Sequence, residues 1–259
     1  MKLEDLVVYE DDSVIVIDKP SGLVVNRSET SEDQTLQDLI SQYLNLGSDL
    51  GVGERAGIVH RLDRETSGLL IIAKAVSAFE NLQGQFKNRS IQKEYIALVH
   101  GNIDKSEGVV DAPIGRIGSF GKFGVMENGR ESKTFYKVDK QLALDEELFE
   151  KLVDGFNKNK IRYLSTHGRT FSLLTLMPKT GRTHQIRVHL KSINKPLVSD
   201  KIYGPGRLLA FDLTWCPRLF LHAKSIEFIN PGTGKRMFFD SELPEDLVAA
   251  LEQLESSSQ

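Results

Sequence analysis

The sequence contains a single cysteine, Cys216, and this excludes both a disulfide framework and a multi-cysteine zinc site. Long hydrophobic runs are missing as well. The longest uncharged apolar runs, near residues 69–73 and 219–221, are far shorter than the ~20 residues that a membrane-spanning helix needs. The first residues carry acids where a signal or transit peptide carries bases. These absences predict a soluble protein of a reducing compartment, which we place in the cytoplasm.

The composition is that of a folded protein. Hydrophobic residues make up 40% and charged residues 27% of the 259 residues, enough to bury a sizeable core. The chain shows neither an internal repeat nor a clear linker. We therefore expect one domain over residues 1–259, with its core at about 7–254.

Charges of one sign are concentrated in blocks, although the net charge is only −3. Residues 55–100 contain 7 bases and 4 acids, and residues 171–224 contain 9 bases and 2 acids. Acidic stretches stand at both ends of the chain. Phosphate binding depends on local patches rather than on the total charge, so nucleic acid is not excluded. Charge alone does not distinguish such a surface from a solvated face.

Hydrophobic periodicity predicts a mixture of strands and helices. Runs at 7–10 and 14–17 predict a hairpin, and the glycine-rich stretch 115–129 predicts a loop. Further strands are expected at 69–73, 93–100, 172–176, 219–222, 225–229 and 237–239. Helices are expected at 36–44 (capped by Asp33 or Thr35), from a capping box at Ser77, at 142–156, from Thr183, and at 247–254. Hairpins dominate, which favours an α+β fold on a mixed, mainly antiparallel sheet with flanking helices.

One candidate site is the segment His60–Gly68, immediately before the apolar strand at 69–73. Asp63 stands between Arg61 and Arg64, and nearby positive charge keeps a carboxylate ionised. An ionised carboxylate in a loop can act as a nucleophile or general base. An ion-paired turn without chemistry is the alternative, and these residues alone do not exclude it.

A second candidate site is the basic segment Pro178–Lys191. Gly181 and Thr183 suit a turn and a helix start, whose free amides together with Arg182 would bind a phosphate. The alternative is a basic solvated helix, but an apolar face and two histidines on the same segment argue against full exposure.

Several other motifs fail. His184 and His189 are five residues apart and cannot share a metal as an i, i+4 pair would, so we expect no metal site. His60, Asp63 and Ser67 lie too close in sequence for triad geometry. The glycines of 115–124 lack the Lys-Ser/Thr of a phosphate loop, so a nucleotide cofactor is unsupported. What remains is a cofactor-free, carboxylate-centred site beside a phosphate-binding surface.

The segment His60–Lys74, HRLDRETSGLLIIAK, resembles the signature of the RluA-type pseudouridine synthases. Further segments are similar to that family in the same order. They are DKPSG at 18–22, QKEYIA at 92–97, Thr180–Leu190, LFLHA at 219–223 and PGTG at 231–234. The matches run from residue 14 to 248, nearly the whole chain, and the fifteen-residue segment alone is highly specific.

The resemblance implies an isomerase that converts specific uridines to pseudouridine in structured rRNA or tRNA, with no cofactor and no metal. Asp63 matches the essential aspartate, Tyr95 the tyrosine that stacks on the target base, and Arg187 the basic partner of the aspartate. The base must be flipped out of the RNA, which costs about a few kcal/mol, and Arg61 resembles the arginine that fills the vacated space. A monomer is expected. The RNA-binding residues are expected to be Arg61, Arg64, Lys179, Arg182, His184 and Lys191.

The sequence also departs from the family pattern. Asn26 and Asn230 stand where many members have histidine, and residues 140–170 are longer than the usual hairpin, so an added helix there could contact a particular substrate. The first predicted strand starts within ten residues of Met1, so we expect a member without an N-terminal S4-like RNA-binding domain.

Two other function classes are weighed against the isomerase. A non-catalytic RNA-binding protein would need the basic blocks but not the set Asp63, Tyr95 and Arg187. A nucleoside hydrolase or glycosidase would also cleave a glycosidic bond, but most glycosidases use a pair of carboxylates and the only acid beside Asp63 is Glu65. A hydrolase would release the free base.

Overall fold

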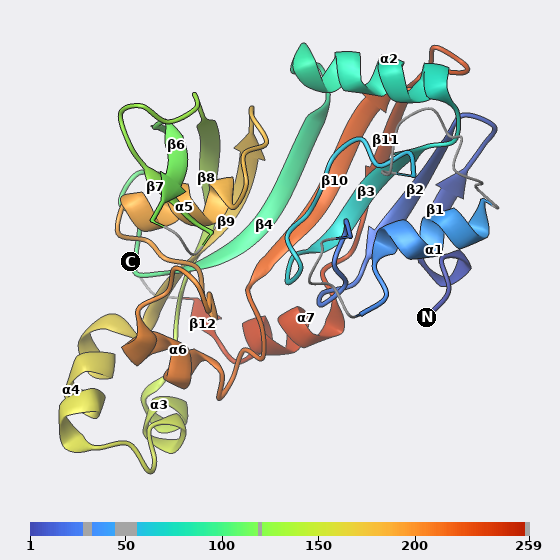
Figure 1. Ribbon diagram of the computed structural model, residues 1–259. Coiled ribbons are helices and arrows are strands. Elements are labelled where there is room, and N and C mark those ends of the chain that lie inside the picture. Colours follow the sequence, from blue (N-terminus) through green and yellow to red (C-terminus); the bar gives the residue numbers. More distant parts are fainter. Residues whose placement is uncertain (28–32, 45–55, 119–120, 257–259) are drawn as a thin grey trace. The chain divides into compact units, whose positions relative to one another are not determined.

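A computed structural model describes residues 1–27, 33–44, 56–118 and 121–256 (Figure 1). The chain forms two compact units. Unit 1 comprises Met1–Lys93 and Ala223–Glu242, and unit 2 comprises Glu94–His222 and Leu243–Gln259. The chain passes between them inside strand β4 (Gln92–His100), inside strand β10 (Leu221–Ile229) and again between Glu242 and Leu243. The single domain expected from the sequence stays a prediction.

Unit 1 is built on a sheet in which β1, β2, β3 and β10 follow one another, and β11 also pairs with β10. The predicted hairpin at its start is confirmed, with Glu10 opposite Ile15. Asp11 closes the turn, because its Oδ1 accepts hydrogen bonds from the amides of Ser13 and Val14 at 2.7 and 2.8 Å. The elements of unit 1 are η1 (Glu4–Leu6), β1 (Val7–Glu10), β2 (Val14–Lys19), α1 (Leu36–Tyr43), β3 (Ser67–Ala73), α2 (Val76–Lys87) and β11 (Arg236–Asp240), with β10 shared.

The core of unit 1 explains why β2 and β3 are apolar along their whole length. Side chains of a strand alternate between its two faces, and Val14 and Val16 pack with Leu69 and Ile71 against helix α2. The residues between them are buried as well, as the 0% exposed Ile15 illustrates. Strands buried on both faces are expected to be continuously hydrophobic, and burying each such side chain contributes about 1.5–3 kcal/mol.

Unit 2 has a sheet in the order β4, β9, β8 and β12, with β5 also paired to β8, and a separate hairpin of β6 and β7. The pairs β4/β9, β8/β9, β5/β8, β12/β8 and β6/β7 are antiparallel. The α+β fold class is thus confirmed. Besides β4 and the start of β10, the elements of unit 2 are β5 (Glu107–Asp111), β6 (Ile114–Ile117), β7 (Lys122–Val125), β8 (Lys133–Ala143), α3 (Glu146–Leu152), α4 (Lys158–His167), β9 (Thr170–Pro178), α5 (Gln185–Ser192), α6 (Gly206–Asp212), α7 (Glu245–Glu252) and β12 (Glu255–Ser256).

The segment 140–170 is an integral part of unit 2. The sequence predicts one helix at 142–156, but β8 continues to Ala143 and two short helices, α3 and α4, follow. Phe149 of α3 and Leu164 of α4 are 3% and 0% exposed and join the core of the unit. The segment is therefore anchored by its own apolar side chains, and its identification as a family-variable insertion stays a prediction.

Other elements also differ from the expectation. The stretch 115–129 is not only a loop, since it contains nearly all of the hairpin formed by β6 and β7. Gly115 and Gly124 are paired across this hairpin. Helix α2 begins after Ala75, which makes no side-chain cap, so the predicted capping box at Ser77 is wrong. The two strands expected at 219–222 and 225–229 are the single strand β10. Helix α1 behaves as predicted, since Thr35 and Asp38 form a capping box.

Candidate active site

The turn that contains Asp63 is held by the segment Asp18–Gly22. Lys19 is fully buried, and its ammonium donates hydrogen bonds to the carbonyl oxygens of Pro20, Leu23 and Arg64 at 2.9, 3.0 and 3.2 Å. A buried ammonium is tolerated only where such acceptors replace its water. Two of the segments that resemble the family, Asp18–Gly22 and His60–Lys74, are therefore in contact, and the first supports the second.

Further hydrogen bonds fix the same turn. The amide of Gly22 donates to the carbonyl of Arg64 at 2.8 Å, and the Ser21 hydroxyl donates to the carbonyl of Glu65 at 2.8 Å. Within the turn, the amide of Thr66 donates to the carbonyl of Asp63 at 3.1 Å. Backbone groups alone make these contacts on the side of the Asp63 turn, so its backbone is anchored independently of the carboxylate.

Gly68 is the second residue of β3, just after the turn, and its position requires glycine. Its φ is +112°, and an added Cβ would lie 2.3 Å from the carbonyl oxygen of Ala223 in β10. Side chains are essentially never found in such a conformation or at such a distance. The close approach of the β10 backbone explains why glycine follows Ser67.

The arginines beside Asp63 do not both point to it. Arg61 is exposed. Arg64 donates from Nε to the carbonyl of Gly22 at 3.1 Å, and its guanidinium lies 3.9 Å from the carboxylate of Asp33. Both side chains are on the surface, where cations can reach phosphates, and their role in binding RNA stays a prediction.

His60 is a structural residue rather than a catalytic base. Its Nε2 accepts a hydrogen bond from the amide of Ile71 at 3.0 Å, and its ring packs on Phe86 with centroids 4.8 Å apart. Burial lowers the pKa of His60 to about 3, and the charge of Lys93 acts in the same direction. The neutral imidazole is thus part of the support of β3.

This burial predicts a loss of stability in acid. The folded state keeps His60 neutral, with a pKa of about 3, whereas the unfolded chain has the ordinary value of 6.5. The unfolded state therefore binds more protons between these values, and stability falls as the pH drops from 6.5 toward 3. At pH 4.5 we expect His60 to reduce the free energy of unfolding by about 2–3 kcal/mol. Urea unfolding at pH 7 and 4.5, followed by circular dichroism, measures this change in the free energy of unfolding.

The matched variants are His60→Gln and His167→Gln. Glutamine keeps an acceptor for the amide of Ile71 but does not titrate, so His60→Gln should flatten the acid dependence. His167 is exposed, and its replacement should leave the dependence of the wild type unchanged. Equal slopes for all three proteins would show that His60 does not carry the effect.

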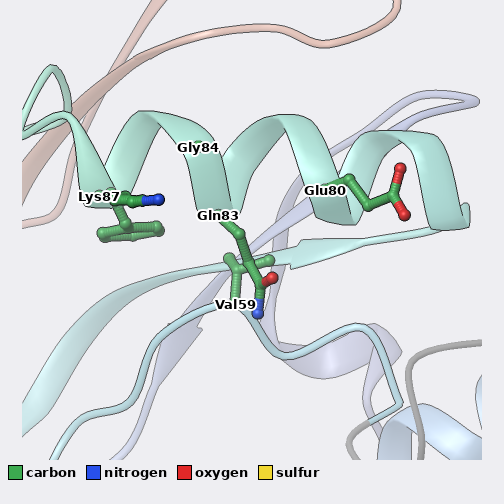
Figure 2. Close-up of a pocket in the computed structure, with 6 residues that line it drawn as sticks. Val59, Glu80, Gln83, Gly84 and Lys87 are labelled. Atoms are coloured by element: carbon green, nitrogen blue, oxygen red, sulfur yellow. The ribbon is translucent and has the colours of Figure 1, made fainter.

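A pocket of about 480 Å³ lies against helix α2 in unit 1 (Figure 2). It is lined by Val59, Glu80, Gln83, Gly84, Phe86 and Lys87. Lys93 lies over the Phe86 ring at 5.5 Å from the centroid, and burial lowers the pKa of Lys93 to about 8. The pocket holds one acid and one lysine but does not include the Asp63 turn, so it is not the predicted catalytic site.

In unit 2, the segment between β9 and α5 is organised by Gln185, which is 4% exposed. Its Oε1 accepts hydrogen bonds from the Thr180 hydroxyl at 2.6 Å and the Arg182 amide at 3.1 Å. Its Nε2 donates to the carbonyl of Lys133 and the hydroxyl of Thr134, each at 3.0 Å. Helix α5 therefore begins at Gln185 rather than at Thr183. The Arg182 amide is bonded within the chain, and the predicted binding of a phosphate by the free amides of the helix start and Arg182 stays a prediction.

Arg187 is almost completely buried and is held by an acid that the sequence analysis missed. Its Nε and Nη2 donate to the two carboxylate oxygens of Asp200 at 2.9 and 2.7 Å, with exposures of 2% and 1%. Oδ1 of Asp200 also accepts from the amides of Ile202 and Tyr203, each at 2.9 Å. Burial by itself would raise the pKa of Asp200, but the hydrogen bonds and charge of Arg187 hold it below its ordinary value. Asp200 is therefore the anionic partner of Arg187.

Tyr203, also missed, contacts His184, which precedes α5, and two basic residues of α5. Its hydroxyl lies 2.8 Å from Nδ1 of His184, and Arg187 and Lys191 lie over its ring at 5.2 and 5.6 Å from the centroid. Arg182 and Lys179 are directed elsewhere: Nε of Arg182 donates to the carbonyl of Glu131, and Lys179 lies over Phe135. No periodicity or motif marks Asp200 or Tyr203, since both lie in irregular chain after α5.

Tyr95 stands at the start of β4, opposite Leu176 of β9, and is 8% exposed. The predicted catalytic residues are thus divided between the units, with Asp63 in unit 1 and Tyr95 and Arg187 in unit 2.

Asn230, one of the departures from the family pattern, caps the turn after β10. Its Oδ1 accepts hydrogen bonds from the amides of Gly232 and Thr233.

In the parts of the chain that the structure describes, no three His, Cys, Asp or Glu side chains come close enough to hold a metal ion. Over the same residues, no helix is both long and apolar enough to cross a membrane.

A family model for RNA pseudouridylate synthase matches residues 13–192. This chain belongs to the RNA pseudouridylate synthase family. The match includes the Asp63 turn, Tyr95 and Arg187, and the resemblance to RluA-type synthases is confirmed. The family is one of RNA isomerases.

Relatives in this family are similar over nearly the whole chain. Ribosomal large subunit pseudouridine synthase D of Nitrosomonas europaea is 37% identical over 252 residues, which are 96% of this chain and 64% of that protein. The protein of the same name from Pseudomonas aeruginosa is 37% identical over 257 residues, 96% of this chain and 71% of that protein. The chain thus spans somewhat less than two thirds of the first of these pseudouridine synthases.

Solved structures agree on the pseudouridine synthase fold. Human RNA pseudouridylate synthase domain containing 1 is similar with a TM-score of 0.69 and 24% identity, covering 96% of this chain and 89% of that one. Human RNA pseudouridylate synthase domain containing 4 has a TM-score of 0.67 and 22% identity, covering 99% and 96%.

Proposed function

We propose that this protein isomerises specific uridines to pseudouridine in structured RNA, with Asp63 as the catalytic residue. The observation that carries the proposal is the family match over residues 13–192, a range that includes Asp63 and the segment His60–Lys74 that resembles the RluA-type signature. The anchoring of its turn by backbone groups and by the buried Lys19 supports this role, because a catalytic group must be held in place by its surroundings.

The reaction exchanges one bond for another without a change in composition. The bond between C1′ of the ribose and N1 of uracil breaks, the base turns, and C1′ bonds to C5. The hydrogen on C5 leaves as a proton and N1 gains one. Asp63 starts the cleavage by attacking or otherwise activating the nucleoside, Tyr95 stacks on the base and assists removal of the C5 proton, and Arg187 is the basic partner that keeps Asp63 anionic.

We infer that the substrate is large-subunit rRNA, with tRNA as the alternative. The support is that the relatives at 37% identity are named for the large ribosomal subunit. A monomer that acts in the cytoplasm without a metal or cofactor belongs to the same proposal.

Pseudouridine mapping of total RNA from cells with and without the gene tests the proposal. Carbodiimide labelling and primer extension should show the loss of one or a few sites in the deletion strain, restored by the wild-type gene but not by Asp63→Asn. Purified protein on unmodified transcripts separates the other classes, because a hydrolase would release free uracil and a simple RNA-binding protein would change nothing. Either of those results would overturn the isomerase.

Tyr95→Phe tests the second role. The phenyl ring keeps the stacking surface, and Tyr95 packs at a β-sheet position that phenylalanine also favours. If the hydroxyl takes part in proton transfer, single-turnover rates should fall by about 10²-fold or more while the Kd for RNA stays within about twofold. An unchanged rate would reduce Tyr95 to a stacking platform.

A further inference from the structure

We propose that the surface which helix α4 leaves outside the core, together with Arg207 of α6, is a second RNA-binding surface, which contacts the substrate RNA through residues other than the predicted site residues. It is called the α4–α6 face below and is formed by Lys158, Lys160, Arg162, Tyr163, His167 and Arg207. Lys158 and Arg162 share one side of α4, and Lys160, Tyr163 and His167 share the side next to it. The inference rests on the proposed function, because the RNA is the substrate of that reaction. Helices α4 and α6 are in contact within unit 2, as Figure 1 also shows.

The first observation is an excess of cations without acidic partners. Helix α4 contains no acid, although its neighbour α3 begins with Glu146 and Glu147. Within the described residues, no carboxylate forms an ion pair with Lys158, Lys160, Arg162 or Arg207. Other arginines of unit 2 are paired, as Arg169 is with Glu146 at 2.5 Å and Arg218 with Asp246 at 2.5 Å.

The placement of these cations opposes the stability of the helix. Lys158 and Lys160 stand in the first turn of α4, where the helix dipole is itself positive and acids are preferred. Lys158 and Arg162 are four residues apart and therefore repel each other on one face. Natural sequences break such local rules chiefly at functional sites. A polyanion on this face would turn the same charges into favourable contacts.

The second observation is a stack of planar groups on the neighbouring side of α4. Tyr163 and His167 are one helical turn apart, with ring centroids 4.5 Å apart and planes at 14°. The Arg207 guanidinium of α6 lies over the Tyr163 ring, with Cζ 5.2 Å from its centroid. His167 and Arg207 are exposed. Unpaired RNA bases stack on aromatic rings and on arginine planes, so this arrangement suits RNA better than an acidic protein.

The decisive experiment removes charge from this face and, in a matched control, from elsewhere. The test variant is Lys158→Gln, Arg162→Gln and Arg207→Gln. The control variant is Lys2→Gln, Lys105→Gln and Lys235→Gln, which removes the same charge from exposed lysines outside the face. Both full-length proteins are measured against large-subunit rRNA and bulk tRNA purified from cells that lack the gene. Melting temperatures should change little in the test variant, because the relief of repulsion between Lys158 and Arg162 opposes the loss of the Arg207 contact with Tyr163.

We expect the Kd of the test variant for its substrate RNA to rise at least about tenfold at 0.1 M salt. The slope of log K against log salt should decrease by about two to three, one for each lost phosphate contact. KM should rise similarly, with kcat within about twofold. The control variant should stay within about twofold of the wild type in each quantity.

Equal affinity of the test variant and the wild type would overturn the α4–α6 face as an RNA site and leave an acidic protein as its partner. An equal loss in the control would show that only total charge matters, which also overturns it. Failure of the proposed isomerase would give a different result. If the wild type forms no pseudouridine but the test variant still binds RNA more weakly than the control, the α4–α6 face binds RNA and the proposed reaction is wrong.

Discussion

Asp63→Asn is expected to reduce pseudouridine formation by at least about 10³-fold while folding and RNA binding remain intact. An amide cannot act as the anionic nucleophile or base that breaks the glycosidic bond. The exchange should leave the turn in place, because the carbonyls of Asp63, Arg64 and Glu65 accept hydrogen bonds that the change does not touch. Release of tritium from RNA that carries [5-³H]uridine measures the reaction, since C5 loses its hydrogen when it bonds to the ribose.

Glu65→Gln is the matched control. Glu65 lies in the same turn, and its carbonyl accepts the Ser21 hydroxyl whatever its side chain. The variant should keep activity within about threefold of the wild type, because the proposed chemistry uses one carboxylate, whereas a glycosidase mechanism would use a pair. Residual activity of Asp63→Asn above a few per cent would remove Asp63 from its role. An equally large loss in Glu65→Gln would favour the paired-carboxylate mechanism.

The part of the site that the sequence predicted is local. The Asp63 turn, the strand after it and the start of the basic segment all follow from residues close together in the chain, where turn chemistry and periodicity are informative. Gly68 is an instructive case. Glycine after a turn predicts unusual backbone freedom, but only the structure identifies the carbonyl of Ala223, 155 residues later, as the reason that no side chain fits.

What the sequence did not predict depends on contacts made across the chain. His60 belongs by sequence to a charged loop, but its ring accepts a hydrogen bond from the amide of Ile71 and packs on Phe86. Its pKa falls because of burial, which no local pattern reports. Arg64 likewise looks like a partner of Asp63, yet its Nε binds the carbonyl of Gly22. Adjacency in sequence is therefore a poor guide to charge pairing.

The same reasoning explains the segment 140–170. Its apolar residues predict one helix, but a turn at 153–157 divides the segment. Asn157 then caps a second helix, because its Oδ1 accepts a hydrogen bond from the amide of Lys160. Two short helices place Phe149 and Leu164 in the core while the charged residues of α4 stay outside. The expectation of a substrate contact in this segment is made specific by the α4–α6 face, and it stays a proposal.

Asp200→Ala is expected to lower the free energy of unfolding of unit 2 by about 3–5 kcal/mol, the loss observed when one partner of a buried ion pair is removed. Arg187 would keep its charge in a site where it is 2% exposed, and the amides of Ile202 and Tyr203 would lose their acceptor. Urea unfolding followed by the fluorescence of Trp215, the only tryptophan, reports directly on this unit. Activity should fall with it, because the position of Arg187 depends on this pair.

Asp246→Ala provides the comparison, because Asp246 also binds an arginine, Arg218, through two hydrogen bonds but is 40% exposed. Solvent screening should limit the loss of free energy of unfolding in Asp246→Ala to about 1 kcal/mol.

The pH dependence of the free energy of unfolding gives an independent check on Asp200. The pKa of Asp200 is below its ordinary 3.8 in the folded state, so its stabilisation is present above pH 3.8 and is lost as the pH falls through the folded value. Asp200→Ala should therefore lose less stability in acid than the wild type.

The double variant Arg187→Met, Asp200→Leu separates stability from function. Replacing a buried ion pair by apolar residues of similar size is often neutral for stability, so the double variant should be more stable than Asp200→Ala. It should stay below the wild type, because the amides of Ile202 and Tyr203 still lack the Asp200 acceptor. If Arg187 is the basic partner of Asp63, turnover should nevertheless remain low. A double variant that is stable and active would assign the pair to the architecture of unit 2 alone, and a single variant Asp200→Ala as stable as the wild type would contradict the buried pair itself.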